Sequence, residues 1–314
     1  MHRSAMPSVF SILFGVMLST QALAAPNVVT SIKPINDLVQ SVMQGVGEPT
    51  RLIPPGSSPH TYALKPSERQ AAEQADVFVW IGPSVETSLD KVTQVLPKGT
   101  LVLTLSQQPD MLLLPARTGG DWERKPRATP HHPAAHADEH NHDATLDGHL
   151  WLAPANARAI VRTTAEVLSQ RDPEHAVQYQ ANAEQAMQRL GVLDEALKKE
   201  LAAVQNKPFI VFHDAYQYFE HSFDLHAAGS ILVSADSMAS AKRVSQMRDK
   251  IKALGATCVF AEPQFEPKLV TTLVEGTNAR TGVLDPLGAK LPSGMDGYEQ
   301  LLRNLAGSLA GCLR

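Results

Sequence analysis

The apolar positions of this chain form short β-rich runs that alternate with helical patterns. In the first half, strands are predicted at residues 27–32, 51–53, 77–81 and 101–105, and helices at 35–43 and 66–75. Pro66 suits the first turn of its helix, where a missing N–H costs no hydrogen bond. This alternation is typical of βαβ units and predicts a parallel sheet flanked by helices.

A long helical pattern follows in the middle of the chain. Residues 174–204 contain no proline and a single glycine, and apolar residues recur there at steps of three or four or multiples of them. At 1.5 Å per residue this helix would extend roughly 45 Å, the length of a whole domain. Beyond it, strands are predicted at 209–212, 258–261 and 282–284, and helices at 241–254, 267–279 and 298–312.

These patterns predict an α/β protein with two lobes. A length of 314 residues is enough for about two domains. We assign residues 25–150 to an N-terminal α/β lobe, 151–206 to connecting helices that include the long one, and 207–314 to a C-terminal α/β lobe. Each lobe is expected to contain a parallel β-sheet flanked by helices, with the long helix as a strut between the lobes.

Residues 1–24 have the organisation of a secretory signal peptide. Arg3 supplies the positive charge, residues 9–18 are mostly apolar, and Ala22-Leu23-Ala24 fits the small residues of a cleavage site. The apolar run is about ten residues long, whereas a membrane helix needs about twenty. We therefore expect cleavage near Ala24 and export of the mature protein; an uncleaved membrane anchor is the alternative.

Composition narrows the possible classes of function. Lys plus Arg number 28 and Asp plus Glu number 32, for a net charge of -4, so the basic surplus of a nucleic-acid-binding protein is lacking. Cys258 and Cys312 are the only cysteines in the sequence, and in an exported protein an even pair predicts a disulfide. Two separate buried thiols are the alternative.

Histidines are concentrated in residues 115–148, a stretch with few large apolar residues. Five of them lie within twelve positions, among acidic residues: His131, His132, His136, His140 and His142. Such a tract cannot build a core and is predicted to form a loop. Its imidazoles and acids suit weak, exchangeable zinc binding, as an auxiliary metal loop; a solvated linker with no part in binding is the alternative.

Residue types that bind metals follow the predicted strands. In a parallel α/β sheet, ligands bind beyond the carboxyl ends of the strands. His60, His213, Glu262 and Asp285 stand at such positions, and His149 follows a loop and precedes a helical pattern. Neutral imidazoles from His60, His149 and His213 would occupy three corners of a zinc tetrahedron in the cleft between the lobes.

The residues at these positions allow several interpretations. None of the three histidines lies in an HxH or HxxxH spacing, so for each of them a polar residue at a sheet edge is the alternative. Asp214, which follows His213, is equally well explained as a helix cap or a partner of the helix dipole. Glu262 is a zinc ligand, a partner that orients an imidazole, or a hydrogen-bonded structural acid.

Several long segments of the sequence resemble one known family. They are GSSPHTYALKPSERQAAEQADVFVWIGP at 56–83, HLWLAPANAR at 149–158, FIVFHDAYQYFE at 209–220, and CVFAEPQFEP with TGVLDPLGA at 258–289. In this order they are similar to the ZnuA family, the periplasmic zinc-binding components of high-affinity zinc ABC transporters. The resemblance covers essentially the whole mature chain. It implies two α/β lobes joined by one long rigid helix, with the metal in the interlobe cleft.

The resemblance also implies a set of metal ligands. The histidines of its SPH, HLW and FHDAY motifs are His60, His149 and His213, and the acid of LDP, Asp285, binds metal in several relatives. Manganese-binding relatives place Glu at the third position, so His213 favours zinc. The two cysteines match positions that form a disulfide in zinc-type members. Some members carry a Glu before the first histidine; this chain has Pro59, which leaves Asp285 or water as the fourth ligand.

The function implied by the resemblance is capture of Zn²⁺ in the periplasm and its delivery to the membrane permease of a zinc ABC transporter. We expect a monomer that is not an enzyme, with zinc binding that weakens below about pH 6 as the imidazoles become protonated. A manganese or iron carrier of the same fold is one alternative. A zinc-dependent hydrolase with Glu262 as the base is another, although the sequence has no HExxH motif.

Overall fold

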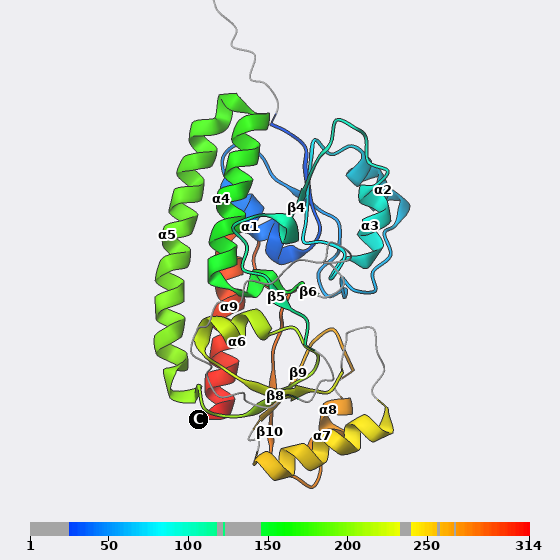
Figure 1. The fold of residues 1–314 in the computed structure, drawn as a ribbon. Helices are drawn as coiled ribbons and strands as arrows, with labels where there is room; N and C mark the ends of the chain where they lie inside the picture. Colours follow the sequence, from blue (N-terminus) through cyan, green and yellow to red (C-terminus); the bar gives the residue numbers. More distant parts are fainter. Residues whose placement is uncertain (1–24, 118–121, 123–145, 233–239, 256–257, 267) are drawn as a thin grey trace, which may run out of the picture.

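The computed structural model describes residues 25–117, 122, 146–232, 240–255, 258–266 and 268–314 (Figure 1). The predicted signal peptide and the five loop histidines, His131, His132, His136, His140 and His142, lie outside these residues. The described residues form two α/β lobes, each with a four-stranded parallel sheet, beside a layer of long helices. Among the described helices, none is both long enough and apolar enough to cross a membrane.

The N-terminal lobe is built on a parallel sheet with the strand order β2-β1-β3-β4. Its strands are β1 (Val28–Thr30), β2 (Thr50–Arg51), β3 (Val77–Trp80) and β4 (Leu101–Thr104). Its helices are α1 (Lys33–Met43), α2 (Pro66–Glu73) and α3 (Thr87–Thr93). All four residues of β3 are buried, because a central strand of a parallel sheet is covered on both faces.

The C-terminal lobe repeats this design with the strand order β10-β9-β7-β8, again parallel. Its strands are β7 (Phe209–Val211), β8 (Ala227–Ser230), β9 (Cys258–Ala261) and β10 (Arg280–Val283). Its helices are α6 (Gln217–Phe223), α7 (Ala241–Leu254) and α8 (Lys268–Val274). Met247 of α7 and Leu273 of α8 are buried in an apolar cluster with residues of this sheet.

Three long helices connect the lobes: α4 (Pro154–Arg171), α5 (Ala176–Leu201) and α9 (Met295–Leu313). The longest, α5, runs alongside both lobes in Figure 1 and packs against α1, α4 and α9. Its buried leucines recur at steps of three or four residues, which is the apolar stripe that predicted the helix. One continuous apolar core includes residues of both sheets and of these helices, so the two lobes are packed as one unit.

Short elements complete the described part of the chain. Its 3₁₀ turns are η1 (Leu105–Gln107), η3 (Leu150–Leu152), η4 (Pro173–His175) and η5 (Ala202–Val204). Strands β5 (Leu114–Pro115) and β6 (Leu146–Asp147) pair antiparallel in a small ribbon that lies between the two lobes in Figure 1. The predicted disulfide is confirmed, because Cys258 at the start of β9 is bonded to Cys312 near the end of α9.

The structure also differs from the predicted elements. Strand β8 has the sequence AAGS, which lacks the β-branched and aromatic residues that indicate a strand. Helices α3 and α6 have seven residues each, too few for a clear helical period. The long helix is shorter than predicted, because η4 and η5 occupy its two ends. Helix α8 ends at Val274, two residues before Gly276, whose φ of 71° is left-handed.

Candidate metal centre

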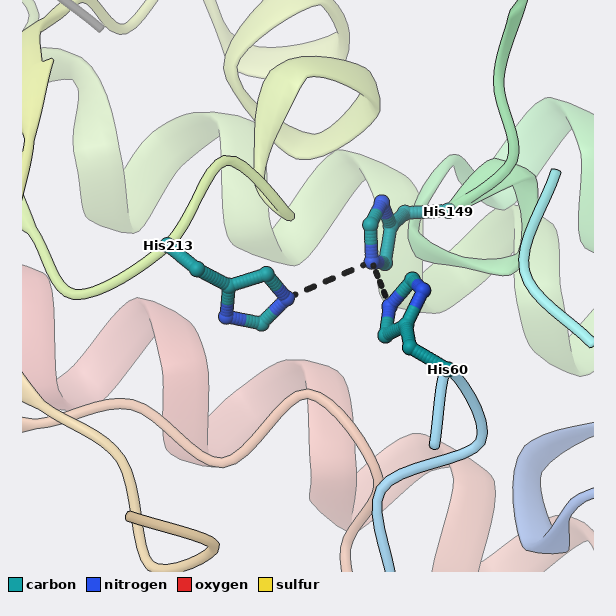
Figure 2. Close-up of side chains that lie close together, drawn as sticks. All are labelled: His60, His149 and His213. Carbon is teal, nitrogen blue, oxygen red and sulfur yellow. Dashed lines mark hydrogen bonds between the residues drawn. The ribbon is translucent and has the colours of Figure 1, made fainter. Parts of the chain in front are cut away.

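Three histidines from distant parts of the chain lie together where the lobes meet (Figure 2). His60 lies in the loop after β2, His149 precedes η3 directly, and His213 lies two residues beyond β7. His149 and His213 are buried, with 7% and 5% of their surface exposed, whereas His60 is half-buried. The structure thus brings together the three histidines that the sequence analysis selected.

The three Nε2 atoms face one another in Figure 2. His149 Nε2 lies 3.2 Å from His60 Nε2 and 3.4 Å from His213 Nε2, and all three ligand nitrogens lie within 4.8 Å of one another. Zn–N bonds of about 2.0–2.1 Å at tetrahedral angles place two ligand nitrogens about 3.3–3.4 Å apart. The spacing of these imidazoles therefore suits a single zinc ion.

Two of the imidazoles are oriented by buried carboxylates. His149 Nδ1 lies 2.7 Å from Asp147 Oδ1, and His213 Nδ1 lies 2.7 Å from Glu262 Oε1. Each carboxylate also accepts a hydrogen bond from the backbone N–H of the same histidine. When the Nδ1–H group of a neutral imidazole donates a hydrogen bond to a carboxylate, Nε2 carries a lone pair, and such carboxylate–histidine pairs are typical of metal centres. Lone pairs that face one another are stabilised by a cation between them.

The electrostatics of the centre keep two rings available for a metal. Burial, reinforced by the neighbouring rings, holds the pKa of His60 and of His149 well below the usual range, so both are neutral near pH 7. Burial also lowers the pKa of His213, but the charge and hydrogen bond of Glu262 outweigh it and raise the pKa overall. Burial raises the pKa of Asp147 to about 7.

A cavity of about 20 Å³ adjoins the three rings. Its lining comes from both lobes and includes Ser58 and Pro59 on one side and Phe265, Pro286 and Leu287 on the other. This volume holds roughly one water-sized body, whereas sites for organic ligands have about 300–1,000 Å³. The cavity therefore has room for a single ion and is too small for an organic ligand.

Glu262 orients His213, whereas the other two predicted acidic residues, Asp214 and Asp285, lie outside the group of three histidines. Asp285 is not part of the histidine group: its Oδ1 accepts hydrogen bonds from Gln264 Nε2 and Leu287 N, and its Oδ2 accepts one from Ala289 N. Asp214 is paired with the guanidinium of Arg117, and helix α6 begins three residues after it, with Tyr216 in the N-cap position. The structure thus places Asp214 in an ion pair with Arg117, and Tyr216 occupies the helix end that was one of the explanations for this acid.

Sequence reasoning missed two residues of this region. Asp147 was not selected, although its position two residues before His149 in LDGHLW was a usable signal, since that spacing lets a carboxylate reach Nδ1. Arg117 was not selected either. It contacts Asp214 and Glu220, which are 97 and 103 residues away in the chain, and no local pattern indicates such a pairing.

Comparisons with known proteins agree with the fold and with this centre. Residues 28–312 match the family model described as ZnuA, zinc-uptake complex component A, periplasmic. The high-affinity zinc uptake system protein ZnuA of Brucella abortus (strain 2308) is 46% identical over 319 residues, which cover 96% of each chain. The corresponding protein of Yersinia pestis is 35% identical and covers 93% of this chain and 92% of its own.

A solved crystal structure of a ZnuA protein superposes with a TM-score of 0.76 at 24% identity, over 92% of this chain and 100% of the other. That likeness shows a shared fold, which agrees with the two lobes and the long joining helix. The match to the family model and the identity to the curated relatives go further. The family consists of periplasmic zinc-binding components of ABC uptake systems, which are not enzymes. This chain belongs to the ZnuA family of periplasmic zinc-uptake components.

Proposed function

We propose that this chain captures one Zn²⁺ ion in the periplasm through His60, His149 and His213, and delivers it to the membrane permease of an ABC transporter. The observation that carries the proposal is the spacing of the Nε2 atoms: His149 Nε2 lies 3.2 Å from His60 Nε2 and 3.4 Å from His213 Nε2, close to the edge of a zinc tetrahedron. Family membership supports the transport role.

Water is the fourth ligand in this proposal. Pro59 has no side chain that can bind a metal, and the carboxylate of Asp285 is engaged by Gln264 and by two backbone N–H groups. Asp285 therefore stabilises the loop that follows β10. We expect Asp285→Asn to change zinc affinity by less than about threefold, since it removes no ligand.

The donor set favours zinc over the alternatives raised by the sequence. Imidazole suits zinc, whereas manganese prefers oxygen ligands such as carboxylate, and the group of converging side chains in the described residues holds no carboxylate. A hydrolase would need room for its substrate, but the cavity of about 20 Å³ at this centre is far smaller than such sites.

The remaining parts of the proposal concern the segments outside the described residues and the assembly. Residues 1–24 act as a signal peptide that is cleaved near Ala24, and the five histidines between His131 and His142 act as an auxiliary loop that gathers zinc weakly. The mature protein acts as a monomer. Mass spectrometry of the exported protein tests the cleavage site, and light scattering with and without zinc tests the oligomeric state.

Competition with a chromophoric zinc chelator tests the central proposal. Wild-type protein, His213→Ala and His221→Ala are compared for the number and affinity of their zinc sites. His221 lies exposed on α6 outside the centre, so its replacement controls for the loss of a histidine as such. We expect one tight site in the wild type and in His221→Ala and none in His213→Ala. Tight binding that survives in His213→Ala would contradict the proposal.

Transport is tested in a bacterial strain that lacks its own zinc-binding component but keeps the permease of a closely related system. We expect the wild-type chain and His221→Ala to restore growth in zinc-depleted medium, and His213→Ala to fail. Restored growth by His213→Ala at equal periplasmic abundance would contradict the role of the histidine centre in delivery.

A further inference from the structure

The β5–β6 ribbon is covalently part of the N-terminal half of the chain but is hydrogen-bonded to the C-terminal lobe. Tyr218 of α6 accepts a hydrogen bond from Leu114 N at 3.0 Å and donates one to the Asp147 carbonyl at 2.7 Å, so a single hydroxyl joins both strands. Gln217 donates to the Pro115 carbonyl at 3.2 Å. The ribbon is therefore seated on the first turn of α6.

Arg117, two residues after β5, makes the strongest of these attachments. All three of its guanidinium nitrogens are used: Nε and one terminal nitrogen bind the Asp214 carboxylate, and both terminal nitrogens bind the Glu220 carboxylate at 2.9 and 3.0 Å. The guanidinium carbon also lies 3.7 Å from the ring centroid of Trp122. Charge-assisted, forked bonds of this kind fix both distance and orientation.

The two carboxylates that Arg117 binds belong to the C-terminal lobe, and one of them adjoins a histidine of the metal centre. Asp214 is the residue after His213, and Glu220 also accepts a hydrogen bond from the backbone N–H of Ala227 in β8. The other strand of the ribbon carries Asp147, whose carboxylate orients His149. Arg117 thus ties the segment that bears His149 to the segment that bears His213.

The segment after His149 is held by the C-terminal lobe as well. Trp151 donates its indole N–H to the Pro286 carbonyl at 2.8 Å, and its own carbonyl accepts from the Tyr298 hydroxyl of α9. His149 is therefore supported by C-terminal residues on both sides. His60, by contrast, lies in the loop that follows β2 of the N-terminal sheet.

We propose that Arg117 is a positioning residue for zinc retention: by binding Asp214 and Glu220 it seats the β5–β6 ribbon on α6 and keeps His149 at chelating distance from His213. The inference rests on the proposed function. Arg117→Lys keeps the positive charge but loses the forked contacts. We therefore expect His149 to be held less firmly relative to His213, and zinc to be released faster.

The test measures zinc release from the full mature protein into an excess of chelator. We compare wild type, Arg117→Lys and Arg189→Lys, of which the last is a matched control. Arg189 also pairs with two acids, Asp296 and Glu299, but it joins α5 to α9 outside the metal centre. We expect Arg117→Lys to release zinc about tenfold faster, in line with other positioning groups at metal sites, and Arg189→Lys to match the wild type.

A second variant covers the case in which Arg117→Lys folds poorly. Arg117→Gln combined with Glu220→Gln removes one positive and one negative charge. The net charge of the group formed by Arg117, Asp214 and Glu220 is therefore unchanged, while the forked contacts of the guanidinium are lost. Visible absorption of the Co²⁺-loaded proteins reports ligand geometry independently of stability. We expect a weaker or shifted tetrahedral spectrum in both Arg117 variants.

The outcomes separate this inference from the proposed function. If the wild type holds no zinc tightly, the proposed function fails. If the wild type binds tightly but the folded Arg117 variants release zinc at the wild-type rate and give the wild-type Co²⁺ spectrum, Arg117 is not a positioning residue. If Arg189→Lys accelerates release as much as Arg117→Lys, the effect comes from general loss of stability and the inference is overturned.

Discussion

The metal centre has two unequal parts. His149 and His213 are buried, and a carboxylate holds the Nδ1 of each at 2.7 Å. His60 is half-buried, and within the described residues the only hydrogen-bond contact recorded for its ring is the one with His149. A carboxylate partner fixes the ring and raises its basicity as a ligand. The pair is therefore prepared for the ion in advance, whereas His60 completes the site from the loop that follows β2.

The largest expected effect is the removal of one member of the prepared pair. His149→Ala or His213→Ala should lower zinc affinity by about a hundredfold or more, because each removes a ligand and leaves a buried carboxylate without its partner. His60→Ala should cost less, since no carboxylate is orphaned. Chelator competition measures all three. A larger loss of zinc affinity in His60→Ala than in the other two variants would contradict the greater importance of the carboxylate-held pair.

The next effect comes from the carboxylates themselves. Asp147→Asn and Glu262→Gln should each lower zinc affinity by about 10–100-fold, because the ring is less firmly oriented and is a poorer donor. Asp172 provides the matched control: it lies 2.7 Å from His175 Nδ1, the same geometry at the turn between α4 and α5. Asp172→Asn should leave zinc affinity unchanged. Equal losses in all three variants would show a general effect on folding.

A smaller effect is expected from the histidine-rich stretch. Deletion of residues 123–145, joined by a short glycine linker, retains Arg117 and Trp122 and removes all five loop histidines. We expect the tight site to keep its affinity within about threefold, because its ligands and their partners are elsewhere, while weaker zinc sites disappear. Equilibrium dialysis over a range of zinc concentrations counts both kinds of site. Loss of the tight site would contradict an auxiliary role.

Replacement of Glu86 is expected to leave zinc affinity unchanged. Glu86 instead makes the stability of the folded protein depend on pH. Its carboxylate is fully buried and accepts hydrogen bonds from Ile81 N and Gly82 N, and burial raises its pKa from 4.5 to about 7. Between these values the native state binds more protons than the unfolded state, so stability falls as the pH rises through this window. The loss contributed by Glu86 reaches about 3 kcal/mol above pH 7.

Glu86→Gln should remove the share of this dependence that Glu86 contributes. Urea unfolding at about pH 5 and about pH 8 should show a loss of stability with rising pH that is about 3 kcal/mol smaller in the variant than in the wild type, while Asp147, whose pKa burial also raises, keeps its own contribution in both proteins. Zinc affinity at pH 7.5 should be the same in both. An identical pH dependence in the two proteins would show that Glu86 is not the titrating group.

The sequence predicted the repeated elements and the histidines well, for physical reasons that are visible in particular residues. The apolar stripe of α5 and the buried run of β3 are local patterns, and local patterns report local structure. His60 and His213 were selected because ligands bind beyond the carboxyl ends of parallel strands, and both lie there. The predicted family and its zinc-uptake function are confirmed.

Other features depend on contacts between distant segments, which no local pattern encodes. The ion pairs of Arg117 with Asp214 and Glu220 span about a third of the chain, and they place the ribbon on the C-terminal lobe although it belongs by sequence to the N-terminal one. Strand β8 is made of small residues whose preference for a strand comes from the neighbouring strand β7. The fourth zinc ligand stays a prediction.

X-ray absorption at the zinc edge, on the protein loaded with one equivalent of Zn²⁺, tests the central claim most directly. The account predicts four light ligands, three of which give the multiple-scattering signature of imidazole, at about 2.0–2.1 Å. The same measurement on His213→Ala should show fewer imidazoles. A six-coordinate, oxygen-rich shell, or fewer than three imidazoles in the wild type, would contradict the three-histidine centre.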